Sequence, residues 1–168
     1  MLVGTEGDFA EFYEATWSRT LAVTYALTGD RGVAEELAQE AYVKAWSHWT
    51  KVTHYDQPAA WVRHVATRLS VSRWRRNKVA AAWLARNRTG AVTSPPDETS
   101  IALVQALLQI PEPQRRAVVL HHLADLPVQE VAHIEGCPVG TVKARLSRGR
   151  AALALLLIDE PNGVNTHV

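Results

Sequence analysis

Near the C-terminal end of this 168-residue chain, two helical patterns meet across a short turn. In the first pattern, Val128, Val131 and Ala132 recur at the i, i+3, i+4 spacing of a helix with one apolar face. Gly136 follows, and glycine readily adopts the left-handed backbone conformation that ends many helices. Pro138 comes next, where its fixed φ angle favours the start of a new helix. The stretch therefore predicts a pair of helices joined by a tight turn.

The second helix of this pair combines an apolar stripe with basic flanks. At alternating spacings of three and four, the stripe consists of Val139, Val142, Leu146, Gly149 and Leu153. The flanks carry Thr141, Arg145 and Arg148 on one side and Lys143, Ser147 and Arg150 on the other. No acidic residue occurs between Glu135 and Asp159. This arrangement is typical of a helix-turn-helix, whose second helix enters the major groove of DNA.

The distribution of charge along the chain bears on this interpretation, because a basic amphipathic helix is also common as a plain solvated surface. The formal net charge is only +1, but it is the sum of segregated blocks. Residues 1–56 hold nine acidic and four basic side chains, residues 57–96 hold eight basic and none acidic, and residues 97–168 hold eight acidic and six basic. Two basic surfaces in acidic surroundings predict one polyanionic partner and one basic or polar protein partner.

Helical periodicity runs through most of the chain, and no segment shows the alternation typical of a β-strand. We expect helices over residues 9–27, from the N-cap Asp30 to about Trp49, from Pro58 to about Arg76, over 101–110 and from Pro113 to Leu123. Glycine, small residues and a proline pair mark residues 89–97 as a linker. The predicted fold class is all-α, with two small helical domains at residues 1–88 and 98–158 and a tail at 159–168.

The predicted first domain has two polar surfaces of opposite character. One helix exposes an acidic ridge made of Glu36, Gln39, Glu40 and Lys44, which taken alone is most simply a solubilising surface. The next helix carries Arg63, Arg68, Arg73, Arg75 and Arg76, with Trp74 among them, and His54 and Tyr55 lie in the loop before it. Arginine forks match phosphate oxygens and an indole stacks on unpaired bases, so this helix suits a single strand of nucleic acid. Burial of Trp74 in the core is the alternative.

The sequence lacks the motifs of common enzymes and of secreted or membrane proteins. There is no glycine-rich phosphate loop, dinucleotide fingerprint, zinc-protease signature or nucleophile elbow. Cys137 is the only cysteine, and His121 and His122 lie on different sides of a helix, so no metal site is expected. The N-terminus has no signal-peptide pattern, and the apolar run 151–158 is too short to span a bilayer. We expect a cytoplasmic protein that is not an enzyme and uses no cofactor.

Three stretches, taken in order, resemble the extracytoplasmic-function (ECF) sigma factors of the bacterial sigma-70 family. Ala34–Trp46 is similar to the family's core-polymerase-binding helix, and Pro58–Arg76 resembles the helix that recognises and melts the minus-ten promoter element. Cys137–Arg148 is similar to the recognition helix for the minus-thirty-five element. The resemblance covers roughly residues 9–157, and Ser72–Arg76 looks more like a subgroup common in actinomycetes. The resemblance thus extends over nearly the whole chain.

The resemblance implies a role for each surface. It implies that the ridge of Glu36, Gln39, Glu40 and Lys44 docks on the clamp coiled coil of the largest polymerase subunit. The minus-ten element would be bound by His54, Tyr55, Arg63, Arg68, Arg73, Trp74, Arg75 and Arg76, with the loop at 52–57 capturing a flipped base. The minus-thirty-five element would be bound by Val139, Gly140, Thr141, Lys143, Arg145 and Arg148, with Arg115 on the DNA backbone.

The chain departs from the family pattern at three positions. Arg68 and Ser72 stand where many members have Asn and Asp, so a minus-ten sequence preference cannot be carried over. Pro127 replaces the usual Ser or Thr cap of the first helix of the helix-turn-helix. Because proline offers no side-chain acceptor for the first amides, we expect that helix start to be less well anchored.

From these residues and this resemblance we expect a sigma factor that binds core RNA polymerase and promoter DNA and directs transcription initiation. An anti-sigma factor is an expected partner, and no membrane insertion is expected. Two alternatives stay open at this point. A stand-alone helix-turn-helix transcriptional regulator explains residues 98–158 but gives no purpose to the surfaces of residues 1–88. A helical adaptor would use its basic faces on other proteins.

Overall fold

The computed structural model describes residues 5–77 and 98–158, and every regular element in these ranges is helical. This confirms the predicted all-α class for the described residues. The predicted linker at 89–97, the last residues of the predicted first domain and the predicted tail at 159–168 lie outside the described residues. Among the helices of the described ranges, none combines the length and apolar character needed to cross a membrane.

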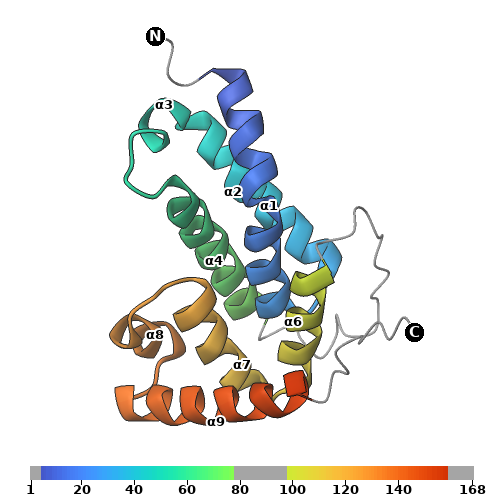
Figure 1. The fold of residues 1–168 in the computed structure, drawn as a ribbon. Coiled ribbons are helices and arrows are strands. Elements are labelled where there is room, and N and C mark those ends of the chain that lie inside the picture. Colours follow the sequence, from blue (N-terminus) through green and yellow to red (C-terminus); the bar gives the residue numbers. More distant parts are fainter. Residues whose placement is uncertain (1–4, 78–97, 159–168) are drawn as a thin grey trace, which may run out of the picture.

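Residues 5–77 form three long helices and one short one (Figure 1): α1 (Glu6–Thr28), α2 (Arg31–Ser47), α3 (Trp49–Val52) and α4 (Pro58–Asn77). As predicted, Asp30 caps α2, because its carboxylate accepts the Val33 amide at 3.1 Å. Gly29 ends α1 at φ 69°, a conformation that costs glycine little. The segment between the helices predicted to end near Trp49 and to begin at Pro58 differs in one respect, since its first residues form the helical turn α3.

Small alanines on α2 bring it close to α1 and α4. Ala34, Ala38, Ala41 and Ala45 are fully buried. Between them, the Tyr42 hydroxyl lies 2.7 Å from the Thr16 hydroxyl and 3.1 Å from that of Thr20, so this buried polar group is satisfied. Burial raises the pKa of Tyr42 above its ordinary value. One face of α2 is therefore fixed in the core, and its opposite face, which carries the predicted acidic ridge, points to solvent.

The C-terminal half consists of α6 (Glu98–Gln109), α7 (Glu112–Val118), η1 (Val119–Leu123), α8 (Val128–Glu135) and α9 (Val139–Ile158). The helix predicted from Pro113 to Leu123 is continuous, but its last turn widens into the π-helical segment η1. There the Ala124 amide donates to the Val119 carbonyl at 2.9 Å, an i to i−5 bond. This widening directs the chain into the loop that contains Asp125.

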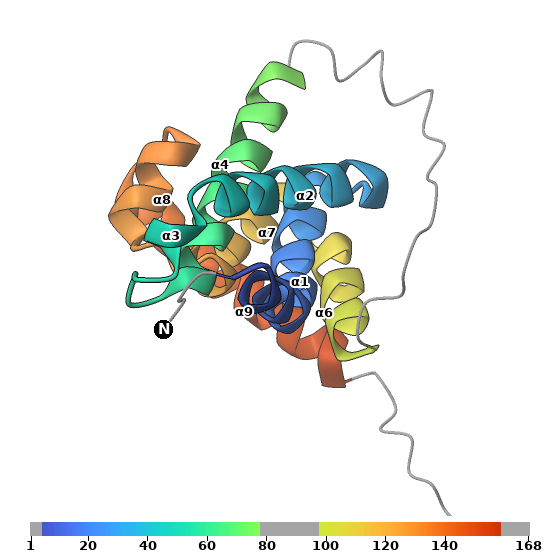
Figure 2. The same ribbon diagram turned by 90° about the horizontal axis from the view of Figure 1, so that it is seen from above.

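The two halves pack against each other, which the sequence did not indicate. Val23, Ala26, Leu27 and Val71 from the N-terminal half share one buried apolar cluster with residues of α6, α7, α8 and α9, such as Leu107. Seen from above (Figure 2), α6 lies beside α1. Figure 1 shows α4 reaching down to α7 and α8. This contact decides which of the predicted binding residues are accessible.

Candidate nucleic-acid interface

The helix-turn-helix forms from α8, the turn at Gly136 and α9. Gly136 adopts φ 62°, and the Cys137 amide donates to the Ala132 carbonyl at 3.1 Å, which closes the end of α8. No side chain caps the start of α8 at Pro127, as predicted. The predicted apolar stripe of α9 is confirmed, since its central members are buried: Val142, Leu146, Gly149 and Leu153. The turn and the stripe together leave the opposite face of α9 free of packing.

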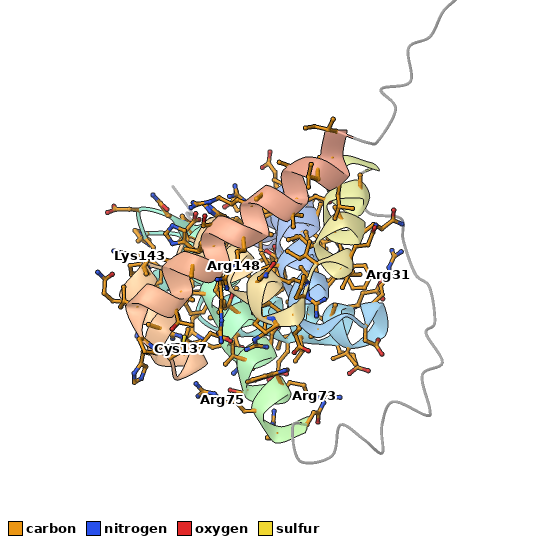
Figure 3. All side chains as sticks on the ribbon, turned by 90° about the horizontal axis from the view of Figure 1, so that it is seen from below. Arg31, Arg73, Arg75, Cys137, Lys143 and Arg148 are labelled. Atoms are coloured by element: carbon orange, nitrogen blue, oxygen red, sulfur yellow. The ribbon has the colours of Figure 1, made fainter. Side chains whose placement is uncertain are left out.

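The exposed face of α9 is basic. Lys143, Ser147, Arg148 and Arg150 are exposed, and Thr141 and Arg145 are half-buried. Figure 3 shows Lys143 and Arg148 along α9. Arg145 reaches back to the turn, where its Nη1 lies 3.7 Å from Cys137 Sγ. A methyl group added at Gly140 would meet no atom within 4 Å, so a ligand can approach the backbone of the first turn. Val139, which is half-buried, and Gly140, which is exposed, both lie in this first turn.

Two arginines near the start of α7 have different environments. Arg116 is buried, and its Nε and Nη2 donate to the Glu135 carboxylate at 3.0 and 2.8 Å. This bidentate pair ties α7 to the end of α8. Arg115 is half-buried, and burial lowers the pKa of its guanidinium below the ordinary value. Its predicted contact with the DNA backbone stays a prediction. The Arg116–Glu135 pair was not predicted from the sequence, in which Glu135 stands out only as the last acidic residue before a basic helix.

The basic helix α4 is only partly accessible. Arg68, Arg75 and Arg76 are exposed and Arg73 is half-buried. Arg63, which the sequence placed on the outer face, is buried at 8% exposure and donates from Nη2 to Asp125 Oδ2 at 2.9 Å. We correct that placement, because the C-terminal half covers this part of α4.

Trp74 lies at the surface of α4 rather than in the core of the N-terminal half. Its Nε1–H donates to Glu112 Oε1 at 2.9 Å, and the guanidinium carbon of Arg116 lies 3.6 Å from its ring centre. The indole is therefore engaged on both its edge and its face. Neither proposed alternative, a free stacking surface or a core position, describes this conformation.

The loop before α4 carries the exposed His54 and Tyr55. His54 Nδ1 bonds the Thr50 carbonyl at 2.7 Å, and the Tyr55 ring lies 6.1 Å from that of Trp61. The loop is held at both ends by α3 and α4. The structure therefore brings this loop to the N-terminal end of the basic helix, as the sequence order required.

The predicted acidic ridge lies along the outside of α2. Glu36, Gln39, Glu40 and Lys44 are all exposed, and Lys44 pairs with Glu40 at 3.9 Å. Val43 and Trp46, which the sequence-based prediction did not include, are 63% and 46% exposed on the same helix. Trp46 packs edge-on against Phe9 at 5.0 Å between ring centres. An acidic ridge next to exposed apolar side chains is suited to binding a protein rather than DNA.

No group of three or more metal-ligating side chains gathers within the described residues. The fold and surfaces define a class: an all-helical DNA-binding protein that carries a helix-turn-helix with an exposed basic face and, on another helix, a separate exposed acidic ridge. Residues 12–79 match the family described as sigma-70 region 2, and residues 100–153 match the family described as sigma-70, region 4.

Curated relatives give the same assignment. The ECF RNA polymerase sigma factor SigW of Bacillus subtilis is 28% identical over 172 residues, covering 93% of this chain and 92% of that protein. SigM of Mycobacterium tuberculosis, also an ECF RNA polymerase sigma factor, is 30% identical over 138 residues, covering 79% and 68%. The chain belongs to the ECF sigma factors of the sigma-70 family.

A solved structure has the same fold. It contains the sigma factor RpoE in complex with the anti-sigma factor NepR from Bartonella quintana, and the match has a TM-score of 0.59 at 24% identity. It covers 91% of this chain and 98% of that one. The likeness therefore extends over both helical halves.

Proposed function

We propose that this protein binds core RNA polymerase and directs promoter-specific transcription initiation. The observation that carries the proposal is the presence, on one chain, of the two sigma-70 regions in family order with their surfaces on separate helices. The acidic ridge on α2 serves as the polymerase contact, and the basic face of α9 serves as the DNA contact. Sigma factors are not enzymes, and the catalytic work belongs to the polymerase. Such a protein acts in the cytoplasm, where polymerase and chromosome are found.

In this function α9 reads the minus-thirty-five element. Lys143 and Arg148, which are exposed, would contact the major groove or its phosphates, together with the half-buried Thr141 and Arg145. Phosphate contacts set the position of a helix on DNA, and only contacts to base edges carry sequence information. Arg115, on α7, would contact the phosphate backbone of the DNA. These residue assignments are part of the proposal.

The N-terminal half holds the opened minus-ten element. His54 and Tyr55 would receive an unpaired base, and the arginines of α4 would contact the phosphates of one strand. Extruding a base costs a few kcal/mol, which stacking on aromatic rings and charge pairing offset. We assign this work to residues 1–88, the reading of the minus-thirty-five element to residues 98–158, and the connection between them to residues 89–97.

An anti-sigma factor is a further proposed partner. The match to RpoE, whose solved structure contains an anti-sigma factor, supports the assignment of the fold. The proposal of a protein partner rests on the exposed acidic side chains of the ridge on α2. A protein that covers Glu36, Gln39 and Glu40 would compete with polymerase for the same exposed surface. Such a partner therefore needs basic or polar side chains opposite these residues.

The experiment that tests the proposal measures association of the purified protein with core RNA polymerase from a related bacterium. We expect a stable complex, weakened at least tenfold by the double substitution Glu36→Arg/Gln39→Ala. Glu14→Arg, at an exposed position on α1 outside the ridge, is the matched control and should leave the affinity unchanged. Tight binding to duplex DNA without any association with polymerase would instead identify a stand-alone regulator.

A further inference from the structure

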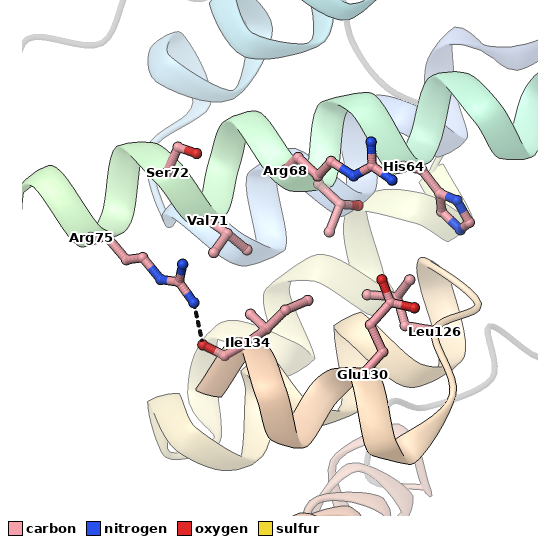
Figure 4. Close-up of a pocket in the computed structure, with 9 residues that line it drawn as sticks. His64, Arg68, Val71, Ser72, Arg75, Leu126, Glu130 and Ile134 are labelled. Carbon is pink, nitrogen blue, oxygen red and sulfur yellow. Dashed lines mark hydrogen bonds between the residues drawn. The ribbon is translucent and has the colours of Figure 1, made fainter. Parts of the chain in front are cut away.

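A pocket of about 260 Å³ lies between α4 and α8 (Figure 4). Its base is apolar, since Val71 and Leu126 are buried and Ile134 is half-buried. Its rim is charged, since Arg68 and Glu130 are exposed to solvent. We propose that this pocket binds a small zwitterion with an apolar side chain, namely a free amino acid of the size of leucine or phenylalanine.

The two walls of the pocket follow from helical periodicity. Residues of α4 that recur at spacings of three and four lie on one face of that helix, and these line the pocket: His64, Thr67, Arg68, Val71, Ser72 and Arg75. On α8, Glu130 and Ile134 are one helical turn apart and share the face that lines the other wall. Two regular helices therefore keep the lining side chains at fixed positions.

Three of the polar lining residues are held by hydrogen bonds within the protein. His64 Nε2 lies 3.0 Å from the Ala124 carbonyl oxygen, and Arg75 Nη2 donates to the Ile134 carbonyl at 2.7 Å. The Thr67 hydroxyl donates to a carbonyl of its own helix at 2.7 Å. The first two bonds join α4 to α8 and to the segment just before it, so both walls are in place before a ligand binds.

The other three polar lining residues are available to a ligand. Within the described part of the chain, Arg68, Ser72 and Glu130 form no hydrogen bond or ion pair. Figure 4 shows Glu130 reaching from α8 towards α4, while Arg68 and Ser72 belong to the opposite wall. A cationic and an anionic side chain thus line the same pocket without pairing with each other.

This pattern of charge selects a zwitterion. A simple anion would meet the Glu130 carboxylate, and a simple cation would meet the guanidiniums of Arg68 and Arg75. A free amino acid carries both charges on neighbouring atoms. Its carboxylate accepts hydrogen bonds from Arg68 while its ammonium group donates to Glu130, so each side chain of the rim gains a partner of opposite charge.

The base and the volume of the pocket select the side chain of the ligand. Val71, Leu126 and Ile134 form an apolar surface, against which a leucine or phenylalanine side chain loses its contact with water. The volume of about 260 Å³ lies just below the range of about 300–1,000 Å³ that is usual for drug-sized ligands, so we expect a smaller molecule. Because the site is complete in the protein alone, its test depends on neither polymerase nor DNA.

The test is a titration of the isotope-labelled full-length protein with L-leucine, in which the backbone amide resonances are followed by NMR. We expect saturable shifts at residues 64–75 and 126–134, with a dissociation constant of about 0.1–1 mM, within the range expected for a ligand of so few atoms. L-Phenylalanine should shift the same resonances. Glycine, which has no side chain to bury, should bind about tenfold more weakly or worse.

Two leucine analogues assign the charges of the ligand to the two walls. Isocaproate lacks the ammonium group of leucine, and isoamylamine lacks its carboxylate. Glu130→Gln should weaken the binding of leucine about fivefold to tenfold without weakening that of isocaproate. Arg68→Met should weaken the binding of leucine by a similar factor without weakening that of isoamylamine. Both positions are exposed, so the circular dichroism of the free protein should be unchanged.

Matched controls lie on α1, outside the pocket. Glu14→Gln and Arg19→Met change exposed charges of the same two kinds and should bind leucine like the unaltered protein. Leucine at about ten times its dissociation constant should also raise the Tm by about 3–5 °C, and Glu130→Gln should reduce this shift. Amide shifts that do not saturate, glycine that binds as tightly as leucine, or pocket variants that match the two controls would each overturn the proposal.

Discussion

The guanidinium of Arg116 lies 3.6 Å from the centre of the Trp74 ring, on the face of an indole that the sequence assigned to DNA. The same guanidinium forms a bidentate pair with Glu135 at the end of α8. One side chain of α7 therefore supports the helix-turn-helix and also covers the basic helix of the other half. The internal stability of the C-terminal half and the accessibility of α4 are linked through this residue.

Breaking the Arg116–Glu135 pair should destabilise the protein strongly. The two side chains are 2% and 6% exposed, so Glu135→Gln leaves a buried guanidinium without its counter-charge. We expect the free energy of unfolding in urea to fall by about 3–5 kcal/mol, and Arg116→Met/Glu135→Leu to recover most of that loss. Glu40→Gln breaks the exposed pair with Lys44 and should cost less than about 0.5 kcal/mol. Equal effects of Glu135→Gln and Glu40→Gln would contradict the assignment.

A side chain at position 149 should destabilise the protein, whereas a methyl group at position 140 should be accepted. A Cβ at Gly149 would lie 2.8 Å from Val118 Cγ2, because α9 crosses α7 at this point. Gly149→Ala should therefore lower the unfolding free energy by about 1–3 kcal/mol, and the added Val118→Ala should reduce the loss. Gly140→Ala meets no atom within 4 Å and gains helix propensity, so it should be neutral or stabilising by up to about 1 kcal/mol. Thermal unfolding of the three variants checks the order.

Local features of this chain were predictable because short-range physics decides them. The stripe Val142–Leu146–Leu153, the cap Asp30 and the turn at Gly136 follow from helical periodicity, side-chain acceptors and the freedom of glycine. The helix-turn-helix and the acidic ridge could therefore be located from the amino-acid sequence alone. The observed elements depart from the expected ones at helix ends, since α1 and α6 begin at residues 6 and 98 rather than 9 and 101, at the helical turn α3 and at the π-helical segment η1.

The contact between the halves was not predictable, because it joins residues far apart in the sequence. Arg63 was assigned to the outer face on its charge, and only the three-dimensional position of Asp125 explains its burial. Nothing in the local pattern pairs Trp74 with Glu112 or Arg75 with the Ile134 carbonyl. The buried pair Arg116–Glu135 likewise joins two residues that no local sequence pattern connects. Long-range ion pairs leave no periodic signal in one sequence.

Stability should rise with pH in the range set by His122. Burial, then the neighbouring His121 and Arg150, lower the pKa of His122 below its ordinary value of 6.5. At a pH between the lowered pKa of His122 in the folded protein and its ordinary pKa of 6.5 in the unfolded chain, the unfolded chain binds a proton that the folded chain does not. The free energy of unfolding therefore falls as pH drops below 6.5. Well above pH 6.5, His122 is neutral in both states and no longer makes the free energy of unfolding depend on pH. Urea unfolding at several pH values should show a shallower slope for His122→Gln and a partial flattening for Arg150→Gln. An unchanged slope in both variants would contradict His122 as the source of the pH dependence.

Removing a basic residue from the exposed face of α9 should weaken promoter binding by the polymerase complex. Lys143→Ala and Arg148→Ala should each lower affinity, and loss of one phosphate contact should make the slope of log K against log salt shallower by about 0.9. Loss of a base-edge contact should instead cost about 1–3 kcal/mol and relax preference at one position. Arg19→Ala, at an exposed position on α1, is the control. Unchanged binding in both α9 variants would contradict the recognition surface.

Run-off transcription tests the central claim most directly. Purified core polymerase from a related bacterium is supplied with pooled genomic promoters, with and without this protein. The account predicts discrete new transcripts whose start sites share two upstream elements, and their loss with Glu36→Arg/Gln39→Ala but not with Glu14→Arg. The absence of new transcripts, together with duplex binding by the protein alone, would contradict it and identify a regulator that acts without polymerase as its obligate partner.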